Sequence, residues 1–435
     1  MGAGRGSTSN AISEAERFRA GSGYELGYKF ATGRASCNAR AVKIAFINSS
    51  AEPGRDGMGD YSLSLAAALR SLGHSVLVVG LTDRWVTTVF TDANSDGVEL
   101  ERIPSSLSLG ERIDTACMRL KTFRPDWMSF QMSCYAHHRK GILCGFNRHL
   151  PRLVATCENW QVMVQELWVG FHVGAPWKHR LVGAVQKYGI QRALRILRPK
   201  LLQTSTPLFQ AFLRTLGMEA SVLPLAGSIP VDPDPGEGWF LEMLGEEGSP
   251  VAAEERSGHL VGGFFGAIYP GWESEGFFPS LRKVAEKTGR KVTIFAAGRM
   301  GAVGEAIWNR LAKEHPGIRF RKLGELPFVR VSHYLRNLDF GIAATTWFLI
   351  GKSSATAAML DHGIPVLVPG TAYRPRQTLQ LEPPADPLLI PAEQDFSARF
   401  IAGLPRRSPR HTSSDLAAEF VRQLEAARSA PRLGD

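Results

Sequence analysis

Two blocks of the chain alternate short apolar segments with amphipathic ones, and this alternation constrains the fold more than any other feature. In the first block, Val42–Asn48 and Val76–Leu81 are apolar runs of strand length. Between them, leucines recur at helical spacing from Asp60, which can cap a helix, to Leu72. A strand, a helix and a strand in such close succession predict a βαβ unit with parallel strands.

The second block repeats the same alternation several times. We expect strands at Leu260–Ile268, Val292–Ala297, Ile318–Leu323, Phe340–Ala344 and Val366–Pro369, and helices at Phe278–Thr288, Ala306–His315, Phe328–Leu338 and Ser353–His362. This pattern predicts a parallel sheet with helices on both faces. The predicted fold class is therefore α/β, with two Rossmann-like lobes that bind ligands in the cleft between them, at the carboxyl ends of the strands.

Domain boundaries follow from changes in composition. Residues 1–40 are rich in Gly, Ala, Ser and Arg without apolar periodicity, and we expect a disordered leader there. Residues 41–226 and 259–412 hold the two lobes. Residues 227–258 contain eight acidic residues and one arginine among many prolines and glycines, and are predicted to form a linker. Residues 413–435 hold a final helix, about Ser414–Ala430, which comes too late for the second sheet.

Composition also excludes several classes of protein. The apolar runs fall far short of the ~20 residues that cross a bilayer, and residues 1–10 lack the apolar core of a secretory signal. The five cysteines are odd in number and irregularly spaced, which fits neither a disulfide framework nor a zinc site. We therefore expect a cytoplasmic protein without a bound metal.

The net charge of +10 predicts an anionic partner. Nucleic acid, anionic lipid and phosphorylated small molecules would all be attracted. We do not expect nucleic acid, because the sequence has neither zinc-finger spacing nor an aromatic and basic RNA-binding motif.

A glycine-rich segment, GRDGMGD, follows the first predicted strand. Within it, Gly57, Met58, Gly59 and Asp60 precede the predicted helix, where glycines let the backbone approach a ligand and helix N–H groups point at it. The alternative is a turn that merely needs glycine.

A second candidate ligand site is Gly351, Lys352, Ser353 and Ser354, before the helix that ends near His362. Backbone donors, the positive end of the helix dipole and one ammonium group would together hold an anion, and a diphosphate is the obvious ligand. The segment is not a Walker motif. The alternative is ordinary serine capping beside an exposed lysine.

Three further side chains are candidates for the same cleft. Arg299 follows a strand of the second lobe, Glu166 lies in an apolar run that makes an unpaired carboxylate costly, and His138 is one of two adjacent histidines. We expect Arg299 to bind the donor and Glu166 and His138 to act in catalysis. The alternatives are an exposed loop arginine, a carboxylate that is simply paired, and a partly exposed loop histidine.

The segment Arg180–Lys200 is basic with apolar residues interleaved. It could lie on an anionic membrane surface. Because Gly183 and Gly189 interrupt it, a pair of helices on the surface of the first lobe is the favoured interpretation.

Three runs of the chain carry a resemblance to a known family: VKIAFINSS…GMGDYSLSLAAALRSLGHSV, LGELPFVRVSHYLRNLDFGIAA and GKSSATAAMLDHGIPVLVPG. On these runs the chain resembles GT-B glycosyltransferases, most like the retaining family 4 type, over roughly Val42–Val368. The resemblance implies transfer of a sugar from a nucleotide-sugar donor, used as co-substrate without a separate cofactor, to an unknown glycan, lipid or small-molecule acceptor. It also implies that Gly57–Asp60 faces sugar and acceptor, that Gly351–Gly363 holds the donor, and that the last helix returns to the first lobe.

The chain departs from that family at its usual pair of glutamates. Ile350 and Ala358 stand at those positions, and Asp361 is a candidate for the ribose contact instead. The family's Arg and Lys after the first strand of the second lobe are also replaced, so Lys352 and Arg299 would supply the positive charge. Two alternatives remain open. The first is a GT-B protein that has lost catalysis, and the second is a nucleotide-sugar epimerase, which typically requires carboxylates in the cleft to move a proton.

Overall fold

The computed structural model describes residues 41–94, 96–246, 249–272, 275–370, 374–381, 384–392 and 395–433. The expected leader, residues 1–40, lies outside them. Among the described helices, none is long and apolar enough to cross a membrane.

The first lobe is built on an eight-stranded sheet in the order β3-β4-β2-β1-β5-β6-β7-β8. Its strands are β1 (Lys43–Asn48), β2 (Ser75–Asp83), β3 (Phe90–Ala93), β4 (Glu99–Pro104), β5 (Trp127–Met132), β6 (Trp160–Val164), β7 (Leu201–Thr204) and β8 (Ser221–Val222). All neighbours pair in parallel except the edge strand β3, which runs antiparallel to β4.

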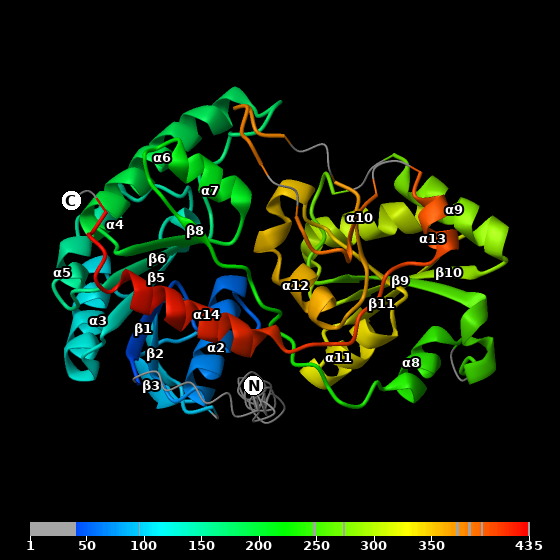
Figure 1. Cartoon of the computed structure of the whole chain (residues 1–435), viewed down its shortest axis with the longest axis horizontal. Coiled ribbons are helices and arrows are strands. Elements are labelled where there is room, and N and C mark those ends of the chain that lie inside the picture. Colours follow the sequence, from blue (N-terminus) through cyan, green and yellow to red (C-terminus); the bar gives the residue numbers. More distant parts are fainter. Residues whose placement is uncertain are drawn as a thin grey trace, which may run out of the picture.

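The second lobe is built on a six-stranded parallel sheet in the order β11-β10-β9-β12-β13-β14. Its strands are β9 (His259–Phe265), β10 (Lys291–Ala297), β11 (Arg319–Gly324), β12 (Phe340–Ile342), β13 (Val366–Val368) and β14 (Leu389–Pro391). Figure 1 shows the two sheets side by side as separate lobes. The expected pair of parallel-sheet lobes is thus confirmed.

Helices cover both faces of each sheet (Figure 1). They are α2 (Gly57–Ser71), α3 (Leu109–Phe123), α4 (Cys144–Asn147), α5 (Leu150–Val154), α6 (Trp177–Leu197), α7 (Pro207–Arg214), α8 (Glu237–Leu244), α9 (Phe277–Thr288), α10 (Gly301–Glu314), α11 (Phe328–Asn337), α12 (Ser354–Asp361), α13 (Ser397–Ala402) and α14 (Thr412–Ala427), with short 3-10 helices η1 (Cys134–Ala136), η2 (Ala253–Gly258) and η3 (Trp347–Lys352). In the first lobe, α3, α5, α6 and α7 pack on one face of the sheet, and α2 and α14 on the other. The apolar strands are therefore buried on both sides, as parallel strands require.

The last helix, α14, belongs to the first lobe although it follows the second sheet in the chain. It packs against α2, and its Phe420 stacks on Phe46 of β1 with 6.0 Å between ring centroids. The chain therefore crosses between the lobes twice, once after β8 and once before α14 (Figure 1).

In each sheet the strand order reverses beside the first strand of the lobe, between β1 and β5 and between β9 and β12. Connections leave these neighbouring strands toward opposite faces, which opens a crevice at their carboxyl ends. This topology places the polar segments after β1, β2, β5 and β6 at the edge of the first lobe that a ligand can reach.

Three local features differ from the sequence-based expectations. The helix α2 begins at Gly57 rather than at Asp60, because Asp56 caps it by accepting a hydrogen bond from the N–H of Met58. Gly57 and Gly59 therefore lie in the first turn of α2. Gly59 is needed there, since a Cβ atom would come within 2.7 Å of the carbonyl oxygen of Ser50.

The basic segment after β6 forms one continuous helix, α6, instead of the expected pair. Its glycines serve close packing, because a Cβ at Gly183 would come within 2.0 Å of the carbonyl oxygen of Val169. A Cβ at Gly189 would lie 3.3 Å from Leu143.

The acidic segment expected as a linker is built into the second lobe over part of its length. It contains α8, whose Phe240 and Leu244 are buried against Phe295 and Tyr334. The guanidinium of Arg319 also donates to the carbonyl oxygen of Leu244. The high content of acidic residues in this segment predicted a linker, whereas the few apolar residues of α8 are enough to form a buried helix.

Candidate functional site

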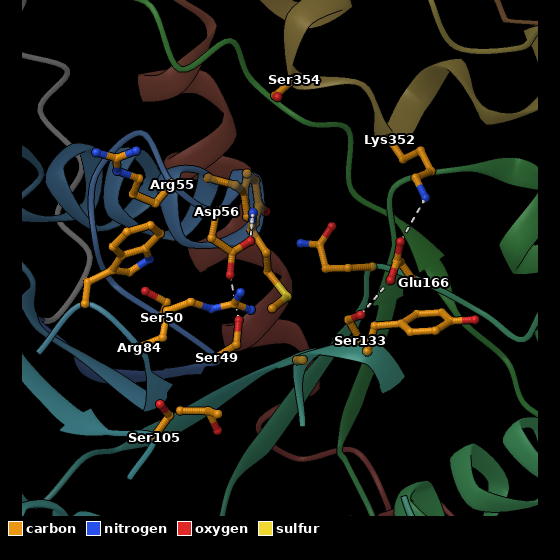
Figure 2. Close-up of a pocket in the computed structure, with 18 of the residues that line it drawn as sticks. Ser49, Ser50, Arg55, Asp56, Arg84, Ser105, Ser133, Glu166, Lys352 and Ser354 are labelled. Carbon is orange, nitrogen blue, oxygen red and sulfur yellow. Dashed lines mark hydrogen bonds and ion pairs between the residues drawn. The ribbon is translucent and has the colours of Figure 1, made fainter. Parts of the chain in front are cut away.

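A cavity of about 670 Å³ lies between the lobes, at the carboxyl ends of the strands of the first sheet. Its size falls within the range of about 300–1,000 Å³ that is usual for small-molecule sites. Most of its wall comes from the segments after β1, β2, β5 and β6, and the second lobe contributes Lys352 and Ser354. Figure 2 shows the polar side chains that point into this cavity, which we call the interlobe cleft. Its lining residues include Ser49, Ser50, Arg55, Asp56, Gly57, Met58, Tyr61, Arg84, Trp85, Ser105, Ser133, Tyr135, Gln165, Glu166, Lys352 and Ser354.

A chain of polar contacts crosses the cleft from one lobe to the other. The Nζ atom of Lys352 lies 3.4 Å from Oε1 of Glu166, and Ser133 Oγ donates to Oε2 of the same carboxylate at 2.6 Å (Figure 2). Lys352 is the last residue of η3, Glu166 follows β6 and Ser133 follows β5. The contact explains how a carboxylate is tolerated next to an apolar strand, since it has both a cation and a hydroxyl as partners.

A second carboxylate, Asp56, faces the cleft from the start of α2. Its Oδ2 accepts a hydrogen bond from Ser49 Oγ at 2.6 Å, while Oδ1 caps the helix. Next to it, the guanidinium of Arg55 lies 4.7 Å from the centre of the Trp85 ring. The first lobe thus presents carboxylates, hydroxyls and a cation over an aromatic surface.

The buried carboxylate of Asp83, at the end of β2, binds two residues that line the cleft. It forms an ion pair with Arg102 at 2.8 Å and accepts hydrogen bonds from Ser50 Oγ and from the N–H of Trp85. Burial alone raises the pKa of Asp83, but the bond from Arg102 and the backbone donors outweigh it and lower the pKa below its ordinary value. This carboxylate stays charged and fixes the loops that carry Ser50 and Trp85.

Asp60, the last residue of the glycine-rich segment, lies beside the cleft in the first turn of α2. Burial raises its pKa to about 6, against the opposing effects of the Gly54 N–H and the positive charge of Arg299. Arg299 comes from the second lobe and forms a two-point ion pair with Glu325, at 2.9 and 2.8 Å. The expected donor-binding Arg299 therefore lies at the lobe boundary near Asp60.

The segment before α12 contains residues with different roles. Ser354 lines the interlobe cleft. Ser353 caps α12, because its hydroxyl accepts the N–H of Thr356. Gly351 packs against the first lobe so closely that a Cβ atom would come within 2.5 Å of the carbonyl oxygen of Ser205.

Two of the expected site residues lie elsewhere. His138 is exposed, and its Nδ1 accepts the N–H groups of Lys140 and Ile142, so the ring holds its own loop instead of facing the cleft. Asp361 is 6% exposed, and its carboxylate accepts the N–H of Gly227 and the hydroxyl of Thr412. Gly227 lies in the crossing after β8, and Thr412 begins α14 directly after the other crossing. Asp361 therefore binds both crossing segments, whereas we expected it to contact a ribose.

Sequence reasoning missed several lining residues, namely Ser49, Asp56, Arg84, Trp85, Ser133 and Gln165. They share one signal, because each lies in a segment that leaves the carboxyl end of an apolar strand, which the topology turns toward the cleft. Among the described residues, no group of three or more His, Cys, Asp or Glu side chains is placed to hold a metal ion.

No protein-family model matches the chain, and no curated protein matches it. Among solved structures, it is similar to a glycosyltransferase from Rickettsia africae ESF-5, with 11% identity, a TM-score of 0.50, and coverage of 91% of this chain and 95% of that one. The Anabaena protein Alr3699/HepE in complex with UDP and glucose matches with 13% identity, a TM-score of 0.48, and coverage of 90% and 92%. Sucrose-phosphate synthase from Thermosynechococcus elongatus matches with 13% identity, a TM-score of 0.46, and coverage of 91% and 92%.

The similarity to the Rickettsia africae structure, at a TM-score of 0.50 and 11% identity, concerns the fold. The strand orders, the returning helix α14 and the cleft between two parallel-sheet lobes agree with it. The chain therefore has the GT-B fold, with polar side chains of both lobes lining the interlobe cleft.

Proposed function

We propose that this protein is a glycosyltransferase that moves a sugar from a nucleotide-sugar donor to an acceptor. The proposal rests on one observation: Lys352 from the second lobe forms an ion pair with Glu166 from the first lobe inside the interlobe cleft. A cation can stabilise the leaving diphosphate and a carboxylate can accept the proton of the reacting hydroxyl, and here both groups lie in the same place. The GT-B fold supplies the frame for both.

In this proposal, Lys352 and the start of α12 bind the diphosphate. The Nζ group supplies a mobile positive charge, and the hydroxyl of Ser354 and backbone N–H groups at the start of α12 supply donors. Arg299, near Asp60 at the lobe boundary, is the second proposed donor-binding cation, and an anionic donor would compete with Glu325 for its guanidinium.

Glu166 is the proposed acid–base residue. During transfer, the bond between the anomeric carbon and the diphosphate oxygen breaks, a bond to the acceptor oxygen forms, and the acceptor's proton must leave. Glu166 can accept this proton, since Ser133 holds its carboxylate toward the cleft. Asp56 then has a positioning role, because both its oxygens bind Ser49 and α2.

The proposal includes a cytoplasmic location, which fits the free thiols of Cys117, Cys134, Cys144 and Cys157. It also includes donor binding without a metal, with Lys352 as the counter-charge. If EDTA abolished binding of the preferred donor and Mg²⁺ or Mn²⁺ restored it, this part of the proposal would fail.

A thermal-shift panel of nucleotide sugars and nucleoside diphosphates tests the proposal. A ligand at 100 times its Kd adds about 2.7 kcal/mol to the free energy of unfolding, so the preferred donor should stand out clearly. Release of nucleoside diphosphate is then measured with candidate acceptors. Transfer that Lys352→Ala and Glu166→Gln both impair is the expected result, and the exposed variants Lys287→Ala and Glu286→Gln serve as matched controls.

Binding without turnover would instead identify a non-catalytic GT-B protein. That second candidate is favoured by Ile350 and Ala358, which are 6% and 0% exposed at the positions where the resembling family carries glutamates. Conversion of the donor to an epimer without any acceptor would identify an epimerase.

A further inference from the structure

The outward face of α6 carries an exposed apolar stripe. Trp177, Leu181, Val185 and Tyr188 follow one another at intervals of four, four and three residues and are 62%, 60%, 44% and 53% exposed. Such spacing places all four on one face of the helix. Figure 1 shows α6 along the outer margin of the first lobe, and the opposite face of the helix packs against the sheet through buried residues such as Ile190 and Leu194.

Basic side chains border this stripe on α6. Lys178 and Arg180 flank its first turn, and Arg192 and Arg195 continue the exposed face beyond Tyr188. The helix sequence contains five Lys or Arg residues and no acidic residue. An exposed apolar stripe within an unbroken positive field is unusual for a surface that faces only water.

The surrounding segment has the same charge bias. Residues 134–200 contain eleven Lys and Arg residues and two Glu, a net charge of +9 out of the +10 of the whole chain. Both glutamates face cations of other segments, since Glu158 lies 3.9 Å from Arg432 and Glu166 lies 3.4 Å from Lys352. The excess charge of the protein is therefore concentrated on the part of the first lobe that carries α6.

We propose that α6 docks this protein on an anionic lipid bilayer, with Trp177, Leu181, Val185 and Tyr188 inserted among the acyl chains near the headgroups. The flanking arginines and lysines would lie at the level of the anionic headgroups, with their aliphatic stems along the apolar surface. Tryptophan and tyrosine favour this boundary because one end of each ring system is apolar and the other is polar. The charge complementarity selects an anionic membrane over a neutral one.

Vesicle sedimentation with the full chain tests this proposal without reference to any enzymatic activity. The protein should bind vesicles of equal parts phosphatidylglycerol and phosphatidylcholine at least tenfold more tightly than vesicles of phosphatidylcholine alone. The binding should weaken at 0.5 M NaCl, because salt screens exposed charges. Failure of the wild-type protein to bind the anionic vesicles would overturn the proposal.

Two double variants separate the apolar from the electrostatic contribution. Trp177→Ser with Leu181→Ser, and Arg192→Glu with Arg195→Glu, should each weaken binding to the anionic vesicles at least tenfold. All four side chains are exposed, so far-ultraviolet circular dichroism and the melting temperature should show an unchanged fold.

Matched control variants lie in the second lobe. Val303→Ser with Val329→Ser removes two exposed apolar side chains, and Arg282→Glu with Lys287→Glu reverses two exposed charges. These controls should bind like the wild type, and equal losses in controls and α6 variants would refute a specific docking face. A dimer in sedimentation velocity that Trp177→Ser with Leu181→Ser dissociates, without vesicle binding by the wild type, would assign the stripe to a second copy of the chain and overturn the proposal.

Discussion

Lys352 Nζ and Glu166 Oε1 lie 3.4 Å apart, so a cation of the second lobe and a carboxylate of the first face each other across the interlobe cleft. Both side chains are about a third exposed, at 31% and 37%. Water therefore screens their attraction, and the pair contributes little to the stability of the fold. An anionic ligand in the cleft competes with Glu166 for Lys352.

Lys352→Ala should weaken binding of the preferred nucleoside diphosphate about 10–100-fold, at ~1.4 kcal/mol for each factor of ten. The lost interaction is a charge-assisted contact to the phosphates. Binding of the free nucleoside, which lacks phosphates, should hardly change. Calorimetry on the wild type and this one variant makes the comparison.

Exposed Lys287 on α9 offers the matched control Lys287→Ala, which should leave both affinities unchanged. Equal weakening for nucleoside and diphosphate would mean that Lys352 shapes the pocket instead of binding the phosphates. If neither ligand is weakened, Lys352 has no part in donor binding.

Glu166→Gln should have opposite effects on binding and turnover. Removal of the negative charge frees Lys352, so the affinity for nucleoside diphosphate should rise about 3–10-fold. The turnover number should fall at least ~100-fold, because the amide cannot accept a proton. Calorimetry and steady-state kinetics measure the two effects, and exposed Glu286→Gln is the control. Unchanged turnover would remove Glu166 from the proposed chemistry.

Gly351→Ala tests the close approach of the lobes beside the cleft. Its Cβ atom would come within 2.5 Å of the Ser205 carbonyl oxygen, a backbone atom that cannot move aside cheaply. The variant should lower the melting temperature and weaken diphosphate binding, since Lys352 is the next residue. Gly238→Ala, where a Cβ atom meets nothing within 4 Å, is the control. It should be neutral or stabilising by up to about 1 kcal/mol, because alanine favours a helix. A Gly351→Ala variant with unchanged melting temperature and affinity would show that this contact is not needed.

The sequence predicted the sheets better than the ends of the helices. Buried strands such as β1 and β10 are continuous apolar runs, so burial on both faces makes them visible in the sequence. The sequence analysis places the start of α2 at Asp60, although Asp56 is also a residue type that can cap a helix. Only the contact of Asp56 with the Met58 N–H distinguishes them.

The cleft was predictable in part. Glu166, Lys352 and Ser354 were expected in it from their places next to strands and a helix, but the ion pair joins residues 186 positions apart, and no local pattern encodes such a distance. Asp361 shows the opposite case. The family resemblance suggested a ribose contact for this residue, whereas its partners Gly227 and Thr412 come from distant segments.

The buried carboxyl of Asp361 should make the stability of the protein depend on pH. Burial raises its pKa from 3.8 to about 6, although bonds from Thr412 and Gly227 oppose the increase. Between these two values the folded state keeps the proton while the unfolded state loses it, so this group's contribution to stability falls as pH rises from about 4 to 6 and stays low above.

Asp361→Asn removes this titration. The amide also loses part of the bonding to Gly227 and Thr412, but that loss is the same at every pH and cancels when two pH values are compared. Relative to the wild type, the free energy of unfolding of the variant should therefore rise by roughly 2–3 kcal/mol between pH 4 and pH 8. Urea unfolding at both pH values measures it, with exposed Asp415→Asn on α14 as the control that shows no such rise. A constant difference between Asp361→Asn and the wild type would mean that Asp361 is ionised throughout, and that its bonds to the two crossing segments outweigh its burial.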